Sequence, residues 1–110
     1  SAAQTTLTQT STDLAKQQKL AILYKFQADA NAARAALNES NLFSAGLKMA
    51  LLVDDLAKMK AMDFSTDEIT GLQSRLDTIQ QNLPGDPANA IKELETLADD
   101  LESMIKIHGQ

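Results

Sequence analysis

The stretch LPGDPANAI, residues 83–91, contains both prolines of the chain and marks a boundary between two helices. Pro84 has no amide hydrogen to continue a helix, and Gly85 follows at a position that favours a turn. Asp86 is a preferred N-cap residue, and Pro87 suits the first position of a helix. The stretch therefore predicts that one helix ends at residue 83 and that the next begins at residue 87.

The segments on either side of this boundary have the hydrophobic spacing of helices in a bundle. Upstream, Ser65 and Glu68 form the S-x-x-E pattern of a capping box, in which each side chain bonds the backbone amide of the other residue. A helix is predicted over 66–83, with apolar residues at spacings of three and four at Ile69, Leu72, Leu76, Ile79 and Leu83. Another is predicted over 87–108, with Gly109 as its cap and apolar residues at Ile91, Leu94, Leu97, Leu101, Met104 and Ile105.

The first half of the chain divides into two further helices. Residues 12–38 contain no Gly or Pro and place apolar residues at helical spacing at Ile22, Phe26, Ala30, Ala33 and Leu37. The segment NESN, residues 38–41, is rich in residues that favour caps and turns. A helix over 41–62 follows, with apolar positions at Ala45, Met49, Leu52, Leu56 and Met59. The alternative is a single helix that continues through NESN.

The order of these helices predicts the architecture. The chain of 110 residues has the length of one domain, and its composition, 44% hydrophobic and 4% aromatic, favours helices over sheets. Because the connections are short, neighbouring helices are expected to run antiparallel. We therefore predict an all-α fold, an up-down-up-down antiparallel four-helix bundle over 12–110. Residues 1–11, rich in Ser, Thr and Gln, are predicted to form a flexible N-terminal leader, and the first turns of the first helix are expected to overhang or fray.

Composition also bears on location. A leader of this kind often follows an export signal or a membrane anchor, which favours a periplasmic or secreted location, with a simple domain boundary as the alternative. The chain has no cysteine, so redox chemistry indicates no compartment. The longest apolar runs, residues 20–24 and 49–53, are far shorter than the roughly 20 residues that cross a bilayer, so no transmembrane segment is predicted.

The distribution of charge argues against nucleic acid as a partner. The net charge is −5, with +2 on residues 1–60 and −7 on residues 61–110. Binding to a phosphate backbone or to anionic lipid needs a clustered basic surface, which this sequence lacks. We therefore expect no binding to nucleic acid.

The sequence also lacks the residues of most catalytic sites. His108 is the only histidine, which excludes catalytic triads, zinc sites of the common types and di-iron bundles, and no glycine-rich phosphate-binding motif occurs. We predict no enzymatic activity and no cofactor. The alternative is a small-ligand, haem or metal carrier that uses His108 with Met59 or Met62, which an up-down bundle brings to the same end. The competing interpretation is a histidine at a helix C-terminus and methionines that fill the core.

A second apolar stripe on the helix over 41–62 is the most specific functional signal. Phe43, Leu47 and Leu51 lie at i, i+4 and i+8, more than 100 degrees around the helix from the main stripe. Either this helix is unusually enclosed, or the second stripe is exposed and forms an interface. An exposed stripe would suit self-association through a two-fold contact or a helical protein partner.

The segment DANAARAAL, residues 29–37, is a second candidate contact surface. Three of its alanines widen the apolar arc of the first helix with very small side chains: Ala32, Ala35 and Ala36. Small side chains allow close approach of a helix, either within the bundle or from a second chain. We therefore expect a non-enzymatic protein that acts by protein–protein interaction, or as a structural or envelope-associated module, through an apolar helix face.

Two acidic features of the sequence need either a cation or solvent. Glu95, Asp99 and Glu102 form a stripe on the last helix, which is either a solvated face or a surface for a basic partner or a divalent cation. Asp29 falls on the apolar arc of the first helix and is expected to reach Lys25 or solvent.

Overall fold

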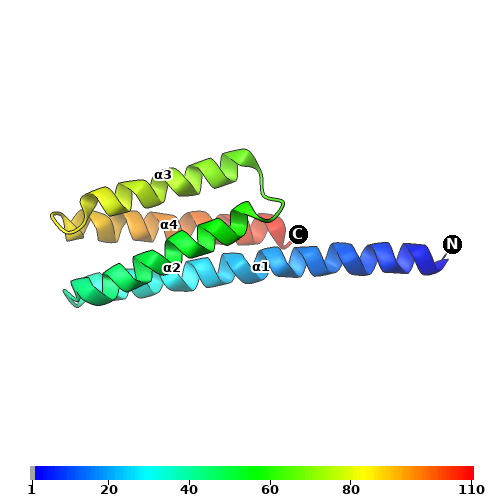
Figure 1. Cartoon of the computed structure of the whole chain (residues 1–110), viewed down its shortest axis with the longest axis horizontal. Helices are drawn as coiled ribbons and strands as arrows, with labels where there is room; N and C mark the ends of the chain where they lie inside the picture. The colour runs from blue at the N-terminus through cyan, green and yellow to red at the C-terminus, as the bar shows by residue number, and fades with distance from the viewer. Residues whose placement is uncertain (1) are drawn as a thin grey trace.

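The chain folds into four α-helices joined by short connections (Figure 1). The computed structural model describes residues 2–110, with side chains from Asp13 onward. The helices are α1 (Ala2–Asn38), α2 (Leu42–Lys60), α3 (Thr66–Asn82) and α4 (Pro87–His108). Residues 2–110 contain no strand, so the predicted all-α class is confirmed.

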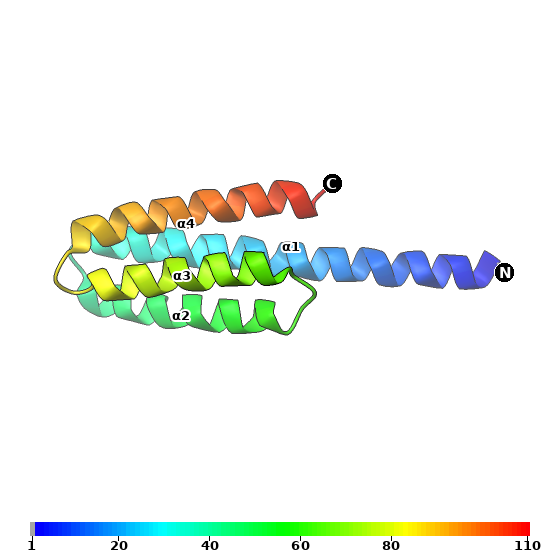
Figure 2. The same ribbon diagram turned by 90° about the horizontal axis from the view of Figure 1, so that it is seen from above.

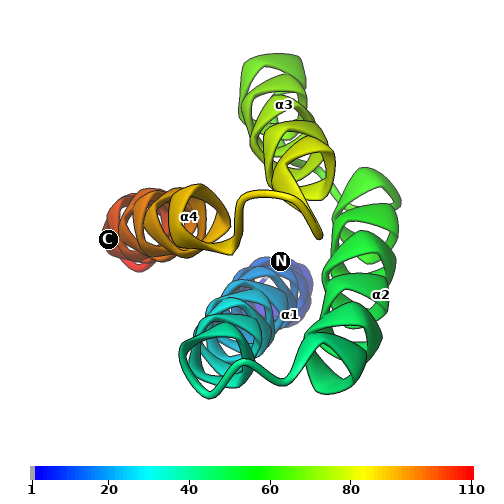
Figure 3. The same ribbon diagram turned by 90° about the vertical axis from the view of Figure 1, so that its left-hand side faces the viewer.

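The four helices form the predicted bundle. Successive helices alternate in direction, and the view along the bundle shows them in a ring around a shared interior (Figure 3). α1 lies between α2 and α4 and packs against both, while α3 packs against α4 and α2. α1 and α3 therefore lie across the diagonal of the ring.

Each helix contributes apolar side chains to one core. The largest fully buried apolar residues come from all four helices: Leu23, Phe26, Leu52, Met59, Leu76, Ile79, Leu94, Leu97 and Leu101. All of them except Leu23 are positions that the three- and four-residue spacings selected, and most of the other selected positions are also buried. Ile69, Leu83 and Ile91, also predicted as core positions, are only partly buried and pack at its edge.

The turn between α1 and α2 separates the two helices. Ser40 has a left-handed φ of 58°, and the amide of Asn41 bonds the carbonyl of Ala36 at 2.8 Å. The Asn41 side chain then caps α2 by accepting a hydrogen bond of 3.0 Å from the amide of Ser44. The alternative of one continuous helix through NESN is therefore wrong, because the turn residues supply both a reversal and a new cap.

The other two connections have the predicted caps. The hydroxyl of Ser65 accepts from the amide of Glu68 at 3.1 Å, and the Glu68 carboxylate accepts from the amide of Ser65 at 3.0 Å. Asp86 accepts from the amide of Asn89 at 3.1 Å, with Pro87 as the first residue of α4. Two C-terminal boundaries shift slightly: α2 ends at Lys60 rather than at residue 62, and α3 ends at Asn82 rather than at residue 83.

The start of α1 differs from the prediction. The structure begins this helix at Ala2, not at residue 12, so residues 2–11 are part of α1; residue 1 lies outside the described residues. No Gly or Pro interrupts this segment, and lengthening an existing helix needs no new nucleus. α1 consequently projects beyond the other helices (Figure 2), as the long extent of the molecule, 61 Å against 23 and 20 Å, also shows.

The glycine in the middle of α3 offers a test of this packing. Gly71 is exposed, and an added Cβ would meet no atom within 4 Å. We expect Gly71→Ala to raise the free energy of unfolding by about 0.5 to 1 kcal/mol, because alanine loses less backbone entropy in a helix. Urea denaturation followed by circular dichroism would measure this change. Leu76→Ala, at a buried position of the same helix, should lower the free energy of unfolding by about 2 to 5 kcal/mol. A less stable Gly71→Ala protein would contradict the placement of α3.

Candidate functional site

The second apolar stripe of α2 lies on the surface. Phe43 is 81% exposed, Leu47 is 56% exposed and Leu51 is 37% exposed. Ala50 and Ala57 are exposed along the same side of the helix. We call these five residues the outer face of α2. The question that the sequence left open is thus answered: α2 is not enclosed, and its second stripe faces away from the core.

α2 has an outer face of this kind because its core face is already complete. Ala45, Met49, Leu52, Leu56 and Met59 are all buried and fill the interior on this side of the bundle. Among the helices of residues 2–110, none covers the opposite side of α2, as the view along the axis shows (Figure 3). An apolar helix face without an intramolecular neighbour remains in solvent until another molecule covers it.

The outer face also carries little charge. Between residues 40 and 53 the only charged residue is Lys48. Farther along the helix, the Lys58 ammonium and the Asp54 carboxylate form an ion pair at 3.1 Å. The exposed side of α4, by contrast, carries Glu95, Asp99 and Glu102 among its charged residues.

The alanine-rich part of α1 is divided between the core and the surface. Ala30 and Ala33 are completely buried, and Ala36 is buried at 7% exposure. Ala32 is half-buried and Ala35 is exposed. The buried alanines of α1 thus allow α2 and α4 to approach α1 closely. Of the three alanines predicted as contact residues, Ala35 is the most exposed.

A charged cluster joins α1 to α2 at the edge of the core. The Lys25 ammonium donates hydrogen bonds of 2.8 Å to the carboxylates of both Asp29 and Asp55. The expectation that Asp29 reaches Lys25 is therefore confirmed. Asp55 is fully buried, and its Oδ2 atom has no hydrogen-bond partner. We call Lys25, Asp29 and Asp55 the Lys25 cluster.

The sequence interpretation missed Asp55, although a signal was present. Asp55 follows Leu52 by three residues and precedes Met59 by four, so it lies on the same arc of α2 as two core residues. The arc was interpreted from its apolar residues alone. When an acidic residue occupies a position with the spacing of core residues, and the neighbouring helix carries a lysine, a buried ion pair is indicated.

The two carboxylates of the cluster titrate differently. Burial, together with the adjacent Asp29 carboxylate, raises the pKa of Asp55 to about 6. Burial alone would raise the pKa of Asp29. The hydrogen bonds of Asp29 with Asp55 and Lys25 have a larger, opposite effect, so the pKa of Asp29 lies below its usual value. Hydrogen bonds to Asp29 and Asp55 raise the pKa of Lys25 above its ordinary value. Asp55 is therefore the member of the cluster that titrates closest to neutral pH.

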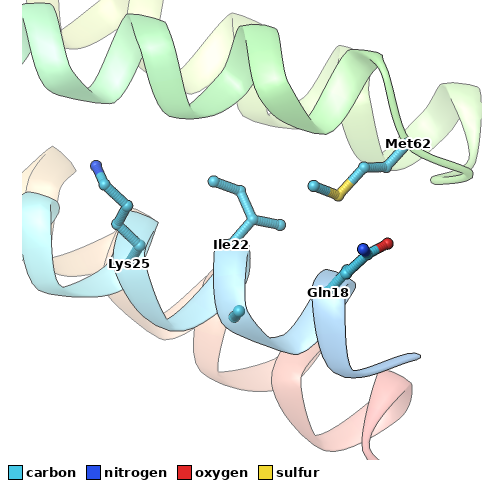
Figure 4. Close-up of a pocket in the computed structure, with 5 residues that line it drawn as sticks. Gln18, Ile22, Lys25 and Met62 are labelled. Atoms are coloured by element: carbon cyan, nitrogen blue, oxygen red, sulfur yellow. The ribbon is translucent and has the colours of Figure 1, made fainter. Parts of the chain in front are cut away.

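A groove lies beside the Lys25 cluster, between α1 and the end of α2 (Figure 4). Its volume is about 410 Å³, and Gln18, Ala21, Ile22, Lys25 and Met62 line it. Lys25 is the charged residue of this lining, but its ammonium already bonds two carboxylates. The groove is a mostly apolar surface depression, with no free cation to attract an anionic ligand.

His108 forms a contact between α4 and α3. Its Nε2 atom lies 2.8 Å from the Glu68 carboxylate, and its ring packs edge-on against Phe64 at 5.0 Å. Burial alone would raise the pKa of Glu68. The contact with His108 and the hydrogen bonds from Ser65 have a larger, opposite effect, and the pKa of Glu68 is therefore lowered. These contacts fit the interpretation of His108 as a helix-end residue.

The contacts found for His108 and for the methionines give the haem alternative no support. Met59 is fully buried, and Met62 lines the groove near Gln18 (Figure 4). In the part of the chain whose side chains are described, no group of three or more His, Cys, Asp or Glu residues converges as a metal site would require. None of the helices in residues 2–110 is both long and apolar enough to cross a membrane.

The acidic stripe of α4 is partly matched by groups on α1. The Glu95 carboxylate lies 3.9 Å from the Arg34 guanidinium, and the Gln27 amide donates a hydrogen bond of 3.0 Å to Glu102. Asp99 is exposed. The stripe is therefore a solvated face with contacts to α1, in line with the simpler interpretation of its sequence.

Comparison of the chain with known protein families, characterised proteins and solved structures found no match.

The Lys25 cluster predicts an unusual dependence of stability on pH. Because the pKa of Asp55 is higher in the folded state, the folded state binds a proton more tightly than the unfolded chain. The resulting stabilisation is complete below pH 3.8, the pKa of Asp55 in the unfolded chain. It is lost as the pH rises through about 6, the pKa of Asp55 in the folded protein. Relative to Asp55→Asn, the wild-type protein should lose roughly 2 kcal/mol of unfolding free energy between about pH 4 and pH 7. Urea titrations of both proteins across this range would measure the difference.

Lys25→Met provides the matched control for this prediction. It removes the cation that favours the ionised form of Asp55, so the Asp55 titration should move to higher pH, as monitored by NMR of the carboxyl carbon. A difference between the wild-type and Asp55→Asn proteins that stays constant with pH would contradict the assignment.

Proposed function

We propose that this protein is a non-enzymatic protein–protein interaction module whose contact surface is the outer face of α2. The observation that carries the proposal is the exposure of three large apolar side chains, Phe43, Leu47 and Leu51, along one side of a single helix. Isolated apolar residues on a surface are common, but a contiguous row of this kind is typical of an interface.

The energetics support this role. Complete burial of a Phe or Leu side chain contributes about 1.5 to 3 kcal/mol of favourable free energy. Phe43 has the largest exposed fraction of the three side chains, so it would gain most from burial. Aromatic residues at the centre of an interface often dominate its binding energy. The helix is already formed and held by its core face, so a partner does not have to supply the entropy cost of ordering it.

The chemistry of the other described groups favours binding over catalysis. Asp55 has a raised pKa, as acid or base catalysts often do, but its side chain is completely buried and bonded to Lys25. Glu68 and His108 bond to each other between two helices. The proposed mechanism is therefore the burial of an apolar helix face.

Site-specific photo-crosslinking in the native cells tests the proposal. A photoreactive amino acid at position 47 should form adducts with a protein partner, and Phe43→Glu introduced into the same chain should reduce their yield at least tenfold, because a charge at the contact opposes burial. Position 107 is the control, because Ile107 is also apolar and is 63% exposed, but it lies on α4. Equal yields at positions 47 and 107, or no adduct at position 47, would rule the proposal out.

A further inference from the structure

We infer that the partner of the outer face of α2 is a second copy of this chain, packed antiparallel across a two-fold axis. The inference rests on the proposed function, because it names the occupant of the same surface. It is argued from the distribution of side-chain size and of charge along α2.

Side-chain size changes along one row of exposed residues that includes four of the five outer-face residues. Beginning at Phe43, positions at spacings of four and three run along this side of the helix: Phe43, Leu47, Ala50, Asp54, Ala57 and Ala61, the last being the capping residue of α2. Spacings of this kind form the seam between two helices. The first two residues are large, the other four are small, and all six are exposed; Leu51, the remaining outer-face residue, lies beside this row.

An antiparallel pair of such helices places large residues opposite small ones. In the register that aligns the seams, Phe43 faces Ala61 of the second copy, Leu47 faces Ala57 and Ala50 faces Asp54. Interfaces pack best when large and small side chains alternate across them. A parallel pair would instead place Phe43 against Phe43 and would leave a gap between the alanines. A two-fold axis repeats each antiparallel contact, so the single face is complementary to itself.

The charge distribution opposes the association of two copies least at this surface. Two chains that each carry a net charge of −5 repel each other, most strongly where the acidic half of the sequence is exposed. The Asp54 carboxylate, which lies in this row, is paired with Lys58 of its own helix. α2 therefore presents a surface that an acidic copy can approach without meeting a row of like charges.

The contact involves essentially one helix from each copy, so we expect weak association. Sedimentation velocity from about 10 µM to about 1 mM, the range suited to interfaces of small area, should show a reversible monomer–dimer equilibrium. Phe43→Glu should raise the dissociation constant at least tenfold, whereas Ile107→Glu, which adds the same charge to an exposed apolar position on α4, should change it less than twofold. Added NaCl should strengthen the dimer, because it screens the repulsion between acidic chains. Both substituted positions are exposed, and circular dichroism would verify that each variant is folded.

The register is tested by disulfide formation, which is possible because the chain has no cysteine. Leu47→Cys and Ala57→Cys proteins are mixed and oxidised, and the products are identified by intact mass. The antiparallel register predicts mainly the mixed dimer that links positions 47 and 57, because two cysteines bond only when their backbones are close. A parallel dimer would yield the two symmetric products instead.

The outcomes separate this inference from the proposed function. A chain that remains monomeric at all concentrations, or a predominance of symmetric disulfides, would overturn the antiparallel self-association. If crosslinks at position 47 were nevertheless formed in cells and were lost in Phe43→Glu, the outer face would bind a different protein, and the proposed function would stand without this inference.

Discussion

A helix with two apolar faces can pack into a bundle in two rotations, and the contact between Lys25 and Asp55 distinguishes them in this fold. In the observed rotation the buried carboxylate of Asp55 accepts a hydrogen bond of 2.8 Å from the Lys25 ammonium of α1. Half a turn of α2 would break this contact, bury Phe43 and carry Asp54 into the core. A buried ion pair contributes little net stability, but a carboxylate carried into the core without a cation, as Asp54 would be, costs several kcal/mol. The pair therefore selects the rotation even though it adds little to stability.

The packing of α1 makes this selection possible. Ala30 and Ala33 are completely buried, so the helices around α1 can approach its backbone closely. Lys25 and Asp29 lie one turn apart on α1, and the ammonium reaches Asp29 and α2 together. The alanines and the ion pair thus act together. The small alanines allow the helices to come close, and the ion pair determines the rotation of α2. Once α2 is held in this way, Phe43 and Leu47 have no intramolecular position to occupy.

The sequence was sufficient for the architecture because its helix boundaries have local causes. The Ser65 and Glu68 capping box, and Asp86 followed by Pro87, act through groups within four residues, which a sequence pattern records directly. The start of α1 has no such local cause. Residues 2–11 mix alanine, leucine and glutamine, which favour a helix, with threonine, which does not, and α1 continues through them to Ala2.

The candidate site was only partly predictable, because periodicity establishes that a stripe is apolar but not what covers it. Phe43, Leu47 and Leu51 were identified from their spacing, whereas their exposure depends on the rotation of α2 and thus on a contact between residues 30 positions apart. Asp55 was missed because an acidic residue within an apolar arc is recognised only together with its cation on another helix. Asp54 and Asp55 show the principle within a single dipeptide: 100 degrees of helical rotation separates a solvated carboxylate on the proposed interface from a buried one that orients it. The residue that looks least compatible with the core is therefore the one that determines which surface the protein presents.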